Sequence, residues 1–205
     1  MPRHLVLLAT RNAGKIHEMR EILATVPDLD LATFEDIPFS DVDETGMTFR
    51  ENALLKARTI GESTGMAVLS DDSGLEVPSL GGEPGVRSAR FAGEPVDYQA
   101  NNRLLLQRLA EPDLNGRRRA RSARFVTWVI LRFDQDHEFS WQGELHGRIL
   151  EAPRGEGGFG YDPLFVPDGC TQTLAEMGSA EKNKISHRRR ALQHVLEFFE
   201  RHAAI

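Results

Sequence analysis

The sequence has a single cysteine, Cys170, among its 205 residues, so a disulfide within the chain is excluded. A lone cysteine suits a reducing compartment. An apolar run long enough to cross a membrane is also lacking, and residues 1–4 lead directly into strand-like sequence without the pattern of a signal peptide. We therefore expect a cytoplasmic protein.

An excess of positive charge is missing as well. The chain has 31 acidic residues against 25 lysines and arginines, and its formal net charge is −6. This balance argues against a general nucleic-acid or membrane binder. Hydrophobic residues make up 40% and charged residues 27%, which is ordinary for a globular protein. The length predicts, over residues 1–205, one large domain or two closely associated lobes.

The adjacent carboxylates Asp71 and Asp72 are the feature that most favours chemistry. The apolar run 66–69 predicts a buried strand, and Ser73-Gly74 after the pair is typical of a turn. We therefore expect both carboxylates where a strand ends, at the edge of an α/β sheet that binds ligands. Two neighbouring carboxylates repel each other, and a divalent cation or a raised pKa relieves the repulsion. The alternative is a solvated Asp-Asp turn.

The N-terminal segment predicts a strand, a turn and a helix. Residues 5–9 form an apolar run, residues 10–15 contain turn chemistry, and apolar residues at helical spacing follow from Ile16. This order presents backbone N–H groups at a positive helix end, which suits phosphate, and Lys15 adds a charge. The P-loop pattern is excluded because Ala9 and Ile16 replace its first glycine and its Ser or Thr. A phosphate loop of another kind and a simple tight turn both remain open.

An acidic loop, residues 41–46, precedes a second helix. The capping box formed by Thr48 and Glu51 predicts a helix that ends near Thr64. Asn52 and Lys56 are four residues apart and so share one face. Lys56 could therefore point toward the acidic loop and the Asp pair, or it could be a solvated helix lysine.

The remaining elements are predicted from periodicity, turns and caps. Asp97 is expected to cap a helix, a second capping box stands at Thr173 and Glu176, and Arg117 to Arg119 are expected in a solvated loop. The predicted strands lie at 29–34, 124–133, 139–149 and 163–167, and the last helix begins at Ser186.

Two further segments favour a ligand. The glycine-rich residues 155–163 would let the backbone approach a ligand, and Phe159 and Tyr161 offer flat surfaces for a base. The alternative is a flexible hairpin loop. Basic residues gather at 182–190, before and within the first turn of the last helix. Because cations there oppose the helix dipole, they suggest an anionic or oxygen-rich ligand, although a solvated stretch is the alternative.

Four segments, taken in this order along the chain, resemble the motifs of a known family: residues 9–15 (ATRNAGK), 71–75 (DDSGL), 157–163 (GGFGYDP) and 185–188 (ISHR). Together they resemble the inosine triphosphate pyrophosphatase family, also called dITP/XTP pyrophosphatases. Shorter matches at 44–46, 51–53, 55–57 and 88–90 extend the resemblance over nearly the whole chain.

The resemblance implies an α/β fold with an elongated, long mixed sheet flanked by helices, two lobes around a central nucleotide-binding cleft, and a homodimer. It implies Mg²⁺-dependent hydrolysis of ITP, dITP and XTP to the monophosphate and pyrophosphate, with no nucleic-acid or membrane partner. Asp72 resembles the proton acceptor and a metal ligand, and Glu44 and Asp71 complete the metal site. The implied substrate-binding residues are Thr10, Arg11, Asn12, Ala13, Gly14, Lys15, Lys56, Ser73, Phe159, Gly160, Tyr161, Asp162, Lys182, His187 and Arg188.

The sequence departs from the family pattern at two positions. Arg11 stands where many members have glycine, and Arg87 stands where an aromatic residue is common. Two other classes of protein remain as alternatives. A nucleotide-sensing module would not require Asp72 beside a metal, and a two-carboxylate glycosidase would not need Lys15 or the basic C-terminal segment.

Overall fold

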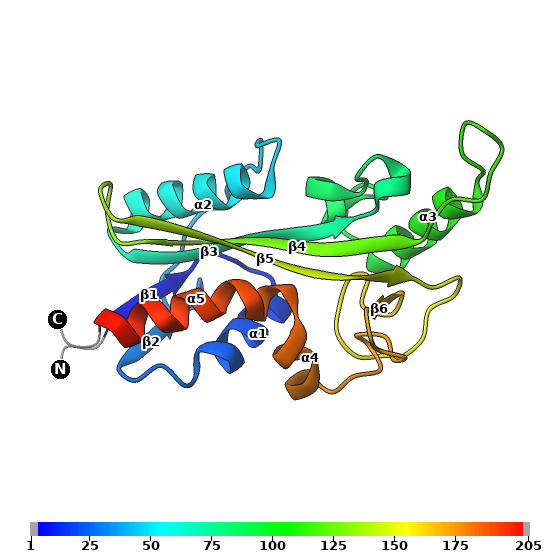
Figure 1. The fold of residues 1–205 in the computed structure, drawn as a ribbon. Helices are drawn as coiled ribbons and strands as arrows, with labels where there is room; N and C mark the ends of the chain where they lie inside the picture. The colour runs from blue at the N-terminus through cyan, green and yellow to red at the C-terminus, as the bar shows by residue number, and fades with distance from the viewer. Residues whose placement is uncertain (1–3, 203–205) are drawn as a thin grey trace. The chain divides into compact units, whose positions relative to one another are not determined.

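The computed structural model describes residues 4–202 and has a mixed α/β fold (Figure 1). Its six strands form one sheet in the order β2-β1-β3-β4-β5-β6. The strands are β1 His4–Leu8, β2 Leu29–Ala32, β3 Ala67–Glu76, β4 Ser122–Arg132, β5 Glu138–Ile149 and β6 Phe165–Pro167. The α-helices are α1 Ala13–Leu23, α2 Phe49–Thr64, α3 Tyr98–Ala110, α4 Ser179–Ile185 and α5 His187–His202, and short 3₁₀ helices span Pro78–Leu80 and Gly85–Arg90.

Contacts divide the chain into two compact units. The first unit contains residues up to Asp72, residues 127–143 and the chain from His187 onward, and the second contains residues 73–126 and 144–186. The sheet is mixed, as expected: β1 pairs in parallel with β2 and with β3, whereas β5 and β6 are antiparallel.

In the first unit, helices cover both faces of the sheet. Side chains alternate along β1, so Val6 and Leu8 pack with α1 and α5, while Leu7 and Ala9 pack with α2 on the opposite face. Figure 1 shows α2 on one side of the sheet and α1 and α5 on the other. Because helices cover both faces, a polar side chain of β3 faces either α1 and α5 or α2, whichever way it points.

The second unit has one hydrophobic core of its own. Leu105 and Leu109 of α3 pack with Phe125 of β4, and Tyr161 and Phe165 complete the cluster. The rings of Phe125 and Phe165 lie 4.8 Å apart. Tyr161 belongs to the glycine-rich segment 155–163, so its packing in this core anchors that segment.

Two predicted helix starts, at Thr48 and Asp97, are confirmed by their caps, and α1 begins at Ala13, inside the residues expected to form a turn. The side chain of Asn12 accepts a hydrogen bond from the Lys15 amide, and Asp97 accepts one from the Ala100 amide. At α2 the reciprocal capping box of Thr48 and Glu51 is complete.

The prediction that a strand ends before the Asp pair is wrong, because β3 continues through both residues to Glu76. Side-chain alternation goes on beyond the pair, with Leu75 and Val77 fully buried on either side of Glu76. The extended backbone is also held from outside: the Asp72 carbonyl accepts from Thr127 Oγ1 at 3.2 Å. Tertiary pairing therefore overrides the turn tendency of Ser73-Gly74.

One prediction about the C-terminal part also needs correction. Thr173 and Glu176 form both capping hydrogen bonds but close a turn, and the helix starts later, at Ser179. In that turn the Ala175 amide donates to the Asp162 carbonyl, which directs the backbone away from a helix. The last helix, expected from Ser186, begins one residue later as α5 at His187, and a separate short helix, α4, that was not expected precedes it.

Other boundaries shift by a few residues: β2 ends at Ala32 rather than at 34, and β6 starts at Phe165 rather than at 163. Within residues 4–202, no helix is both long and apolar enough to span a bilayer.

Candidate functional site

The two carboxylates of β3 point to opposite faces of the sheet. Adjacent strand residues alternate, so Asp71 faces α1 and α5 while Asp72 faces α2. Each is almost fully enclosed, with 0% and 6% of the residue exposed. The alternation relieves part of the repulsion expected between neighbouring carboxylates and gives each its own set of partners.

Asp71 is held by cations. Its Oδ2 lies 3.2 Å from Lys15 Nζ and accepts hydrogen bonds from Arg188 Nη2 at 3.0 Å and Nε at 3.2 Å. Arg188 also donates through Nη1 to Glu18, a buried residue of α1. Burial alone would raise the pKa of Asp71, but Lys15, Arg188 and Lys56 outweigh it and hold the pKa well below its usual range. Asp71 is therefore a permanent anion.

The low pKa of Asp71 predicts a loss of stability in acid. A carboxyl group whose pKa is depressed by folding contributes stability above its unfolded pKa, near 4, and loses it as the pH falls toward the folded value. We expect Asp71→Asn to lower the free energy of unfolding at pH 7 by about 3–5 kcal/mol, because Arg188 and Lys15 lose a buried partner.

Urea unfolding between pH 2 and pH 7 measures this effect. Stability should fall below about pH 4 in the parent protein, and the Asp71→Asn variant should show a flatter profile. The exposed Asp43→Asn substitution is the matched control and should leave the profile unchanged. Parallel profiles for the parent and the Asp71 variant would contradict the assignment.

Asp72 faces Lys56, Asn52 and, through Lys56, Glu44. Lys56 Nζ donates to Glu44 Oε1 at 2.5 Å and to Asp72 Oδ1 at 3.5 Å, and Asn52 Nδ2 donates to Asp72 Oδ2 at 3.3 Å. Asn52 and Lys56 thus share one face, as predicted, and of the two alternatives for Lys56 the structure has the one in which it points toward the acidic loop and Asp72. Burial raises the pKa of Asp72; the charges of Lys56 and Lys15 oppose the rise, while Glu44 and Asp71 add to it. The pKa of Asp71 is lowered and that of Asp72 is raised, so Asp71 stays an anion while Asp72 is the candidate proton acceptor.

Lys56 stays charged in this setting. Burial opposes its charged form, but Asp72, Glu44 and Asp71 outweigh burial, and the pKa of Lys56 is raised. Burial lowers the pKa of Lys15, and Asp71 counters only part of that effect. Two lysines thus reach the acidic pair from different helices, α2 and α1.

Asn52 is a functional candidate that the site prediction omits. Its Oδ1 accepts from the Gly46 amide at 2.7 Å while its Nδ2 donates to Asp72, so one side chain ties the acidic loop to the strand. A Cβ at Gly46 would lie 2.7 Å from that Oδ1, so this approach requires glycine. Glu18 is also missed. Its spacing of four from the buried Ile22 is the signal that would have placed it on the inner face of α1.

The loop 10–15 leads into the N-terminus of α1. Thr10 Oγ1 accepts from the Asn12 amide, Asn12 caps the helix, and Ala13 and Gly14 begin it. The first turn has no acidic residue, so its amides and Lys15 form a positive end. The Arg11 side chain turns away: it pairs with Asp41 at 3.2 Å and lies over two phenylalanine rings, Phe34 and Phe39.

Glu44, Asp71 and Asp72 are the carboxylates that could hold a divalent cation. Among the described residues, no group of three or more His, Cys, Asp and Glu side chains is placed to hold a metal ion. Mg²⁺ is commonly bound by one or two carboxylates, with phosphate and water completing the shell. Glu44 and Asp72, which share the Lys56 ammonium, fit such a site. Within residues 4–202, Asp71 Oδ1 is buried without a hydrogen-bond partner, whereas Oδ2 is taken by cations.

In the second unit, Asp162 organises the glycine-rich segment. Its Oδ2 accepts from Lys182 Nζ at 2.6 Å and from the Phe159 amide at 2.9 Å. The Lys182 ammonium also lies 4.9 Å from the centre of the Phe159 ring, and both Lys182 and Asp162 are buried. Gly158 has φ +70°, and a Cβ there would lie 2.1 Å from Asp162 Oδ2. This segment is therefore tied to a buried ion pair, and the hairpin-loop alternative does not describe it.

The expectation that Tyr161 presents its ring to a base is wrong. The residue is 3% exposed, packs in the core of the second unit and donates its hydroxyl hydrogen bond to the Ser88 carbonyl. The Phe159 side chain is half-buried instead. Asn102 holds the Gly160 carbonyl at 3.1 Å.

The basic residues 182–190 do not all lie at the start of the last helix; they are divided between the end of α4 and the start of α5. Lys182 and Lys184 lie in the last turn of α4, where cations favour the helix dipole. Arg188 is in the first turn of α5, and carboxylates of this chain, Asp71 and Glu18, bind it. His187 is buried at the start of α5, and Ser73 is half-buried on β3.

The fold and the site define a class: an α/β protein in which Lys15, at the start of α1, lies beside carboxylates of a central strand, β3. The comparisons specify the family. The chain matches the Ham1 family over residues 6–198 and belongs to it.

Curated relatives and solved structures agree with this membership. A dITP/XTP pyrophosphatase of Thermus thermophilus is 48% identical over 95% of this chain and 91% of that protein, and one from Nocardia farcinica is 48% identical over 93% and 92%. A HAM1 protein from Coxiella burnetii has a TM-score of 0.86 at 34% identity, covering 97% of this chain and 99% of that one. The Ham1 protein of Staphylococcus aureus has a TM-score of 0.82 at 38% identity, with 96% and 98% covered.

Proposed function

We propose that this chain hydrolyses noncanonical purine nucleoside triphosphates, ITP, dITP and XTP, to the monophosphate and pyrophosphate. The observation that carries the proposal is the environment of Asp72. This buried carboxylate has a raised pKa, accepts from Asn52, and faces a lysine shared with Glu44. The names of the relatives, dITP/XTP pyrophosphatases, support the substrate class.

The first unit supplies the groups for phosphate and for water. The amides at the start of α1, with Asn12 and Lys15, would bind the triphosphate, and Lys56 would neutralise charge beside it. Asp72 would accept the proton of the attacking water, since a carboxylate with a raised pKa is a better base than an ordinary one. Asn52 would keep the carboxylate oriented.

The carboxylates Glu44 and Asp72 would hold Mg²⁺. The resemblance also assigns Asp71 to the metal site, but its side chain lies on the opposite face of β3, so we propose that Asp71 instead holds Lys15 and Arg188. When bound, the ion supplies positive charge that offsets the charge developing on the leaving pyrophosphate. Lys56, which bridges the two carboxylates, would then turn its ammonium toward phosphate oxygens.

The second unit supplies the groups for the base. Lys182, fixed by Asp162, would donate to the 6-keto oxygen, and Phe159 would stack on the ring. The family resemblance also assigns Ser73, Gly160, His187 and Arg188 to the nucleoside, whereas the buried Tyr161 would support the segment from the core. Since Arg188 donates to Asp71 and Glu18, we propose that its main task is to hold Asp71.

A pyrophosphate-release assay over a nucleotide panel, with and without Mg²⁺, tests the proposal. Pyrophosphate release from ITP and XTP that depends on Mg²⁺ supports it. Tight nucleotide binding without release would favour a nucleotide-sensing module, and glycosidase activity without phosphate chemistry would favour the two-carboxylate alternative.

Lys15→Ala is expected to raise KM for ITP by roughly 10- to 150-fold, with a smaller change in kcat. The reason is the loss of a charge-assisted hydrogen bond to phosphate, which contributes about 1.5–3 kcal/mol. Steady-state kinetics at two ionic strengths measures it. Arg11→Ala is the matched control from the same loop; because its side chain pairs with Asp41, KM should stay within about threefold. Equal KM values for the parent and the Lys15 variant would remove this lysine from the phosphate site.

We further propose that the chain acts as a homodimer on the free nucleotides of the cytoplasm, as the family resemblance and the lone Cys170 suggest. Sedimentation equilibrium would test the dimer: a mass near twice the 22.9 kDa of the chain supports it, and a monomer at all concentrations contradicts it.

A further inference from the structure

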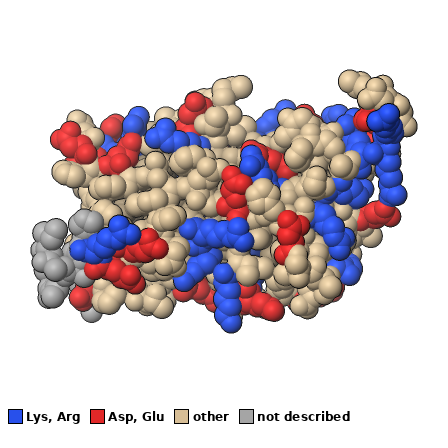
Figure 2. Space-filling model, viewed as in Figure 1, with Lys and Arg blue, Asp and Glu red and all other residues tan. Residues whose placement is uncertain are grey.

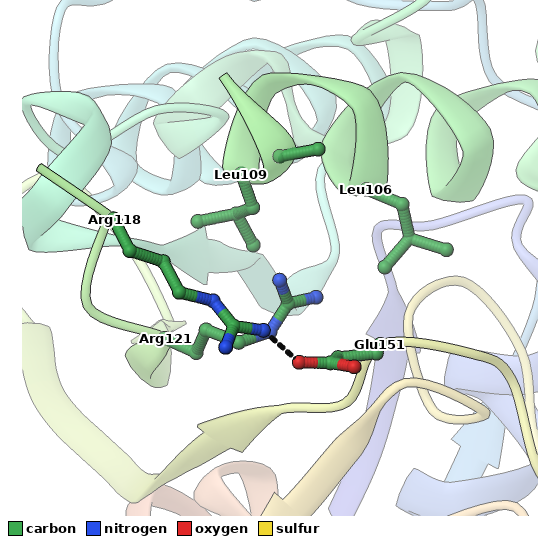
Figure 3. Close-up of a pocket in the computed structure, with 6 residues that line it drawn as sticks. Leu106, Leu109, Arg118, Arg121 and Glu151 are labelled. Carbon is green, nitrogen blue, oxygen red and sulfur yellow. Dashed lines mark hydrogen bonds and ion pairs between the residues drawn. The ribbon is translucent and has the colours of Figure 1, made fainter. Parts of the chain in front are cut away.

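The second unit contains a hollow outside the residues assigned to hydrolysis. It has a volume of about 300 Å³ and is lined by Leu106, Leu109, Ala110, Arg118, Arg121 and Glu151 (Figure 3). The three apolar residues belong to the last two turns of α3, and Figure 3 shows both arginine side chains and Glu151 directed into the space beneath them. The hollow therefore has an apolar wall and a charged wall.

Arg121 is fixed in place by backbone carbonyls. Its Nε donates to the Ile149 carbonyl at 2.8 Å and its Nη2 donates to the Leu150 carbonyl. Within residues 4–202, Nη1 has no acceptor. A guanidinium held in this way loses little side-chain freedom when it meets a ligand.

The charged wall has one more positive than negative group. Arg118 Nη2 pairs with Glu151, which leaves the Arg121 charge unbalanced. Burial lowers the pKa of Arg121; Glu151 counters this, and the nearby charge of Arg118 lowers it further. The surroundings are basic too: residues 103–124 contain seven arginines and two acidic residues, in a chain of net charge −6. Figure 2 shows lysine and arginine side chains gathered over α3 and the loop after it.

We propose that this hollow binds a small organic anion, with its carboxylate or phosphate-monoester head at Arg118 and Arg121 and its apolar body on Leu106, Leu109 and Ala110. The volume is at the lower end for small-molecule sites, which combine apolar walls with a few placed polar groups. An anionic head group bound to Arg121 Nη1 offsets the unbalanced charge. The apolar body of the ligand is removed from water when it packs on the three α3 side chains. None of the lining residues belongs to the groups assigned to ITP, so this site does not rest on the proposed hydrolysis.

Methyl NMR with phenyl phosphate and benzoate tests the proposal, because the leucine methyl groups of the hollow report directly on occupancy. We expect both probes to shift the Leu106 and Leu109 signals, with a dissociation constant of about 1 mM or tighter. Inorganic phosphate, which has the head alone, should bind at least fivefold more weakly. The experiment is repeated in Lys15→Ala protein, so that phosphate binding at the start of α1 does not contribute.

Two surface substitutions should change the affinity in opposite directions. Arg118→Gln removes positive charge and should weaken phenyl phosphate binding about two- to fivefold, whereas Glu151→Gln removes the competing carboxylate and should strengthen it about as much. Both side chains are largely exposed, so both variants should keep the parent melting temperature. If the Arg118–Glu151 pair had only a structural role, both substitutions would change the affinity for phenyl phosphate in the same direction.

Each outcome has a defined meaning. Binding of both probes supports the general anion site, and binding of one alone supports the site and identifies its head group. No shift at Leu106 and Leu109 up to 10 mM probe, inorganic phosphate binding as tightly as phenyl phosphate, or equal changes in the two variants would each overturn the proposal.

Discussion

Asp72→Asn is expected to lower kcat for ITP hydrolysis by about 10²–10⁴-fold, which is the usual contribution of a positioned general base. Asparagine has nearly the same shape and can still accept from Asn52, but it cannot take a proton at neutral pH. It also removes one of the two carboxylates proposed to hold Mg²⁺, so the loss should lie toward the upper end. Stopped-flow or steady-state pyrophosphate release at saturating ITP and Mg²⁺ measures the change.

The matched control is Asp43→Asn, in the acidic loop next to Glu44 but exposed. It removes the same charge close to the same site and should keep kcat within about twofold. Thermal unfolding must show that Asp72→Asn still folds. If the Asp72 variant folds and retains activity within about threefold of the parent, another group takes the proton.

The local part of this site could be predicted from the sequence because short-range rules fix it. The capping box at Thr48 sets the register of α2, and the four-residue spacing then puts Asn52 and Lys56 on one face. The order of strand, turn and helix in residues 5–23 is local in the same way. Such features depend on hydrogen bonds between near neighbours, so the fold class and this order of elements could be predicted.

Long-range contacts explain what the sequence analysis missed. The turn tendency of Ser73-Gly74 suggested a strand end, yet alternation at Leu75 and Val77 extends β3. The sequence alone predicts that Arg188 binds a ligand, because its partners Glu18 and Asp71 lie 170 and 117 residues away in the chain. No rule for near neighbours reaches such distances, and only the packing of α1 and α5 brings these side chains together.

The contacts of Arg188 also bear on how a base would be recognised. With Arg188 engaged by carboxylates, Lys182 is the cation best placed to read a base, because Asp162 and the Phe159 ring fix its ammonium. The ammonium has three N–H donors and no acceptor. A base that offers an acceptor at position 6 satisfies it, whereas a base that offers an amino group there does not.

We therefore expect kcat/KM for ITP and XTP to exceed that for ATP by a large factor. Hypoxanthine and xanthine have a 6-keto acceptor, while adenine has a 6-amino donor that would face the Lys182 donor. A buried unpaired group costs about 1–3 kcal/mol, more if it is charged, and sites built on such hydrogen bonds discriminate by roughly 10⁴–10⁵. Equal use of ATP and ITP would refute this base readout. GTP keeps the 6-keto group, so its exclusion must depend on contacts at the 2-amino position.

Lys182→Ala isolates the contribution of this lysine to the ITP/ATP ratio. We expect the ratio to fall by roughly 10- to 150-fold, through kcat/KM for ITP, since one charge-assisted hydrogen bond contributes about 1.5–3 kcal/mol. The substitution also leaves Asp162 buried without its cation, which costs about 3–5 kcal/mol of stability, so rates are measured well below the melting temperature. Lys184→Ala, an exposed lysine of the same helix, is the control and should leave ratio and stability unchanged. A ratio that survives in folded Lys182→Ala protein would assign base recognition to other groups.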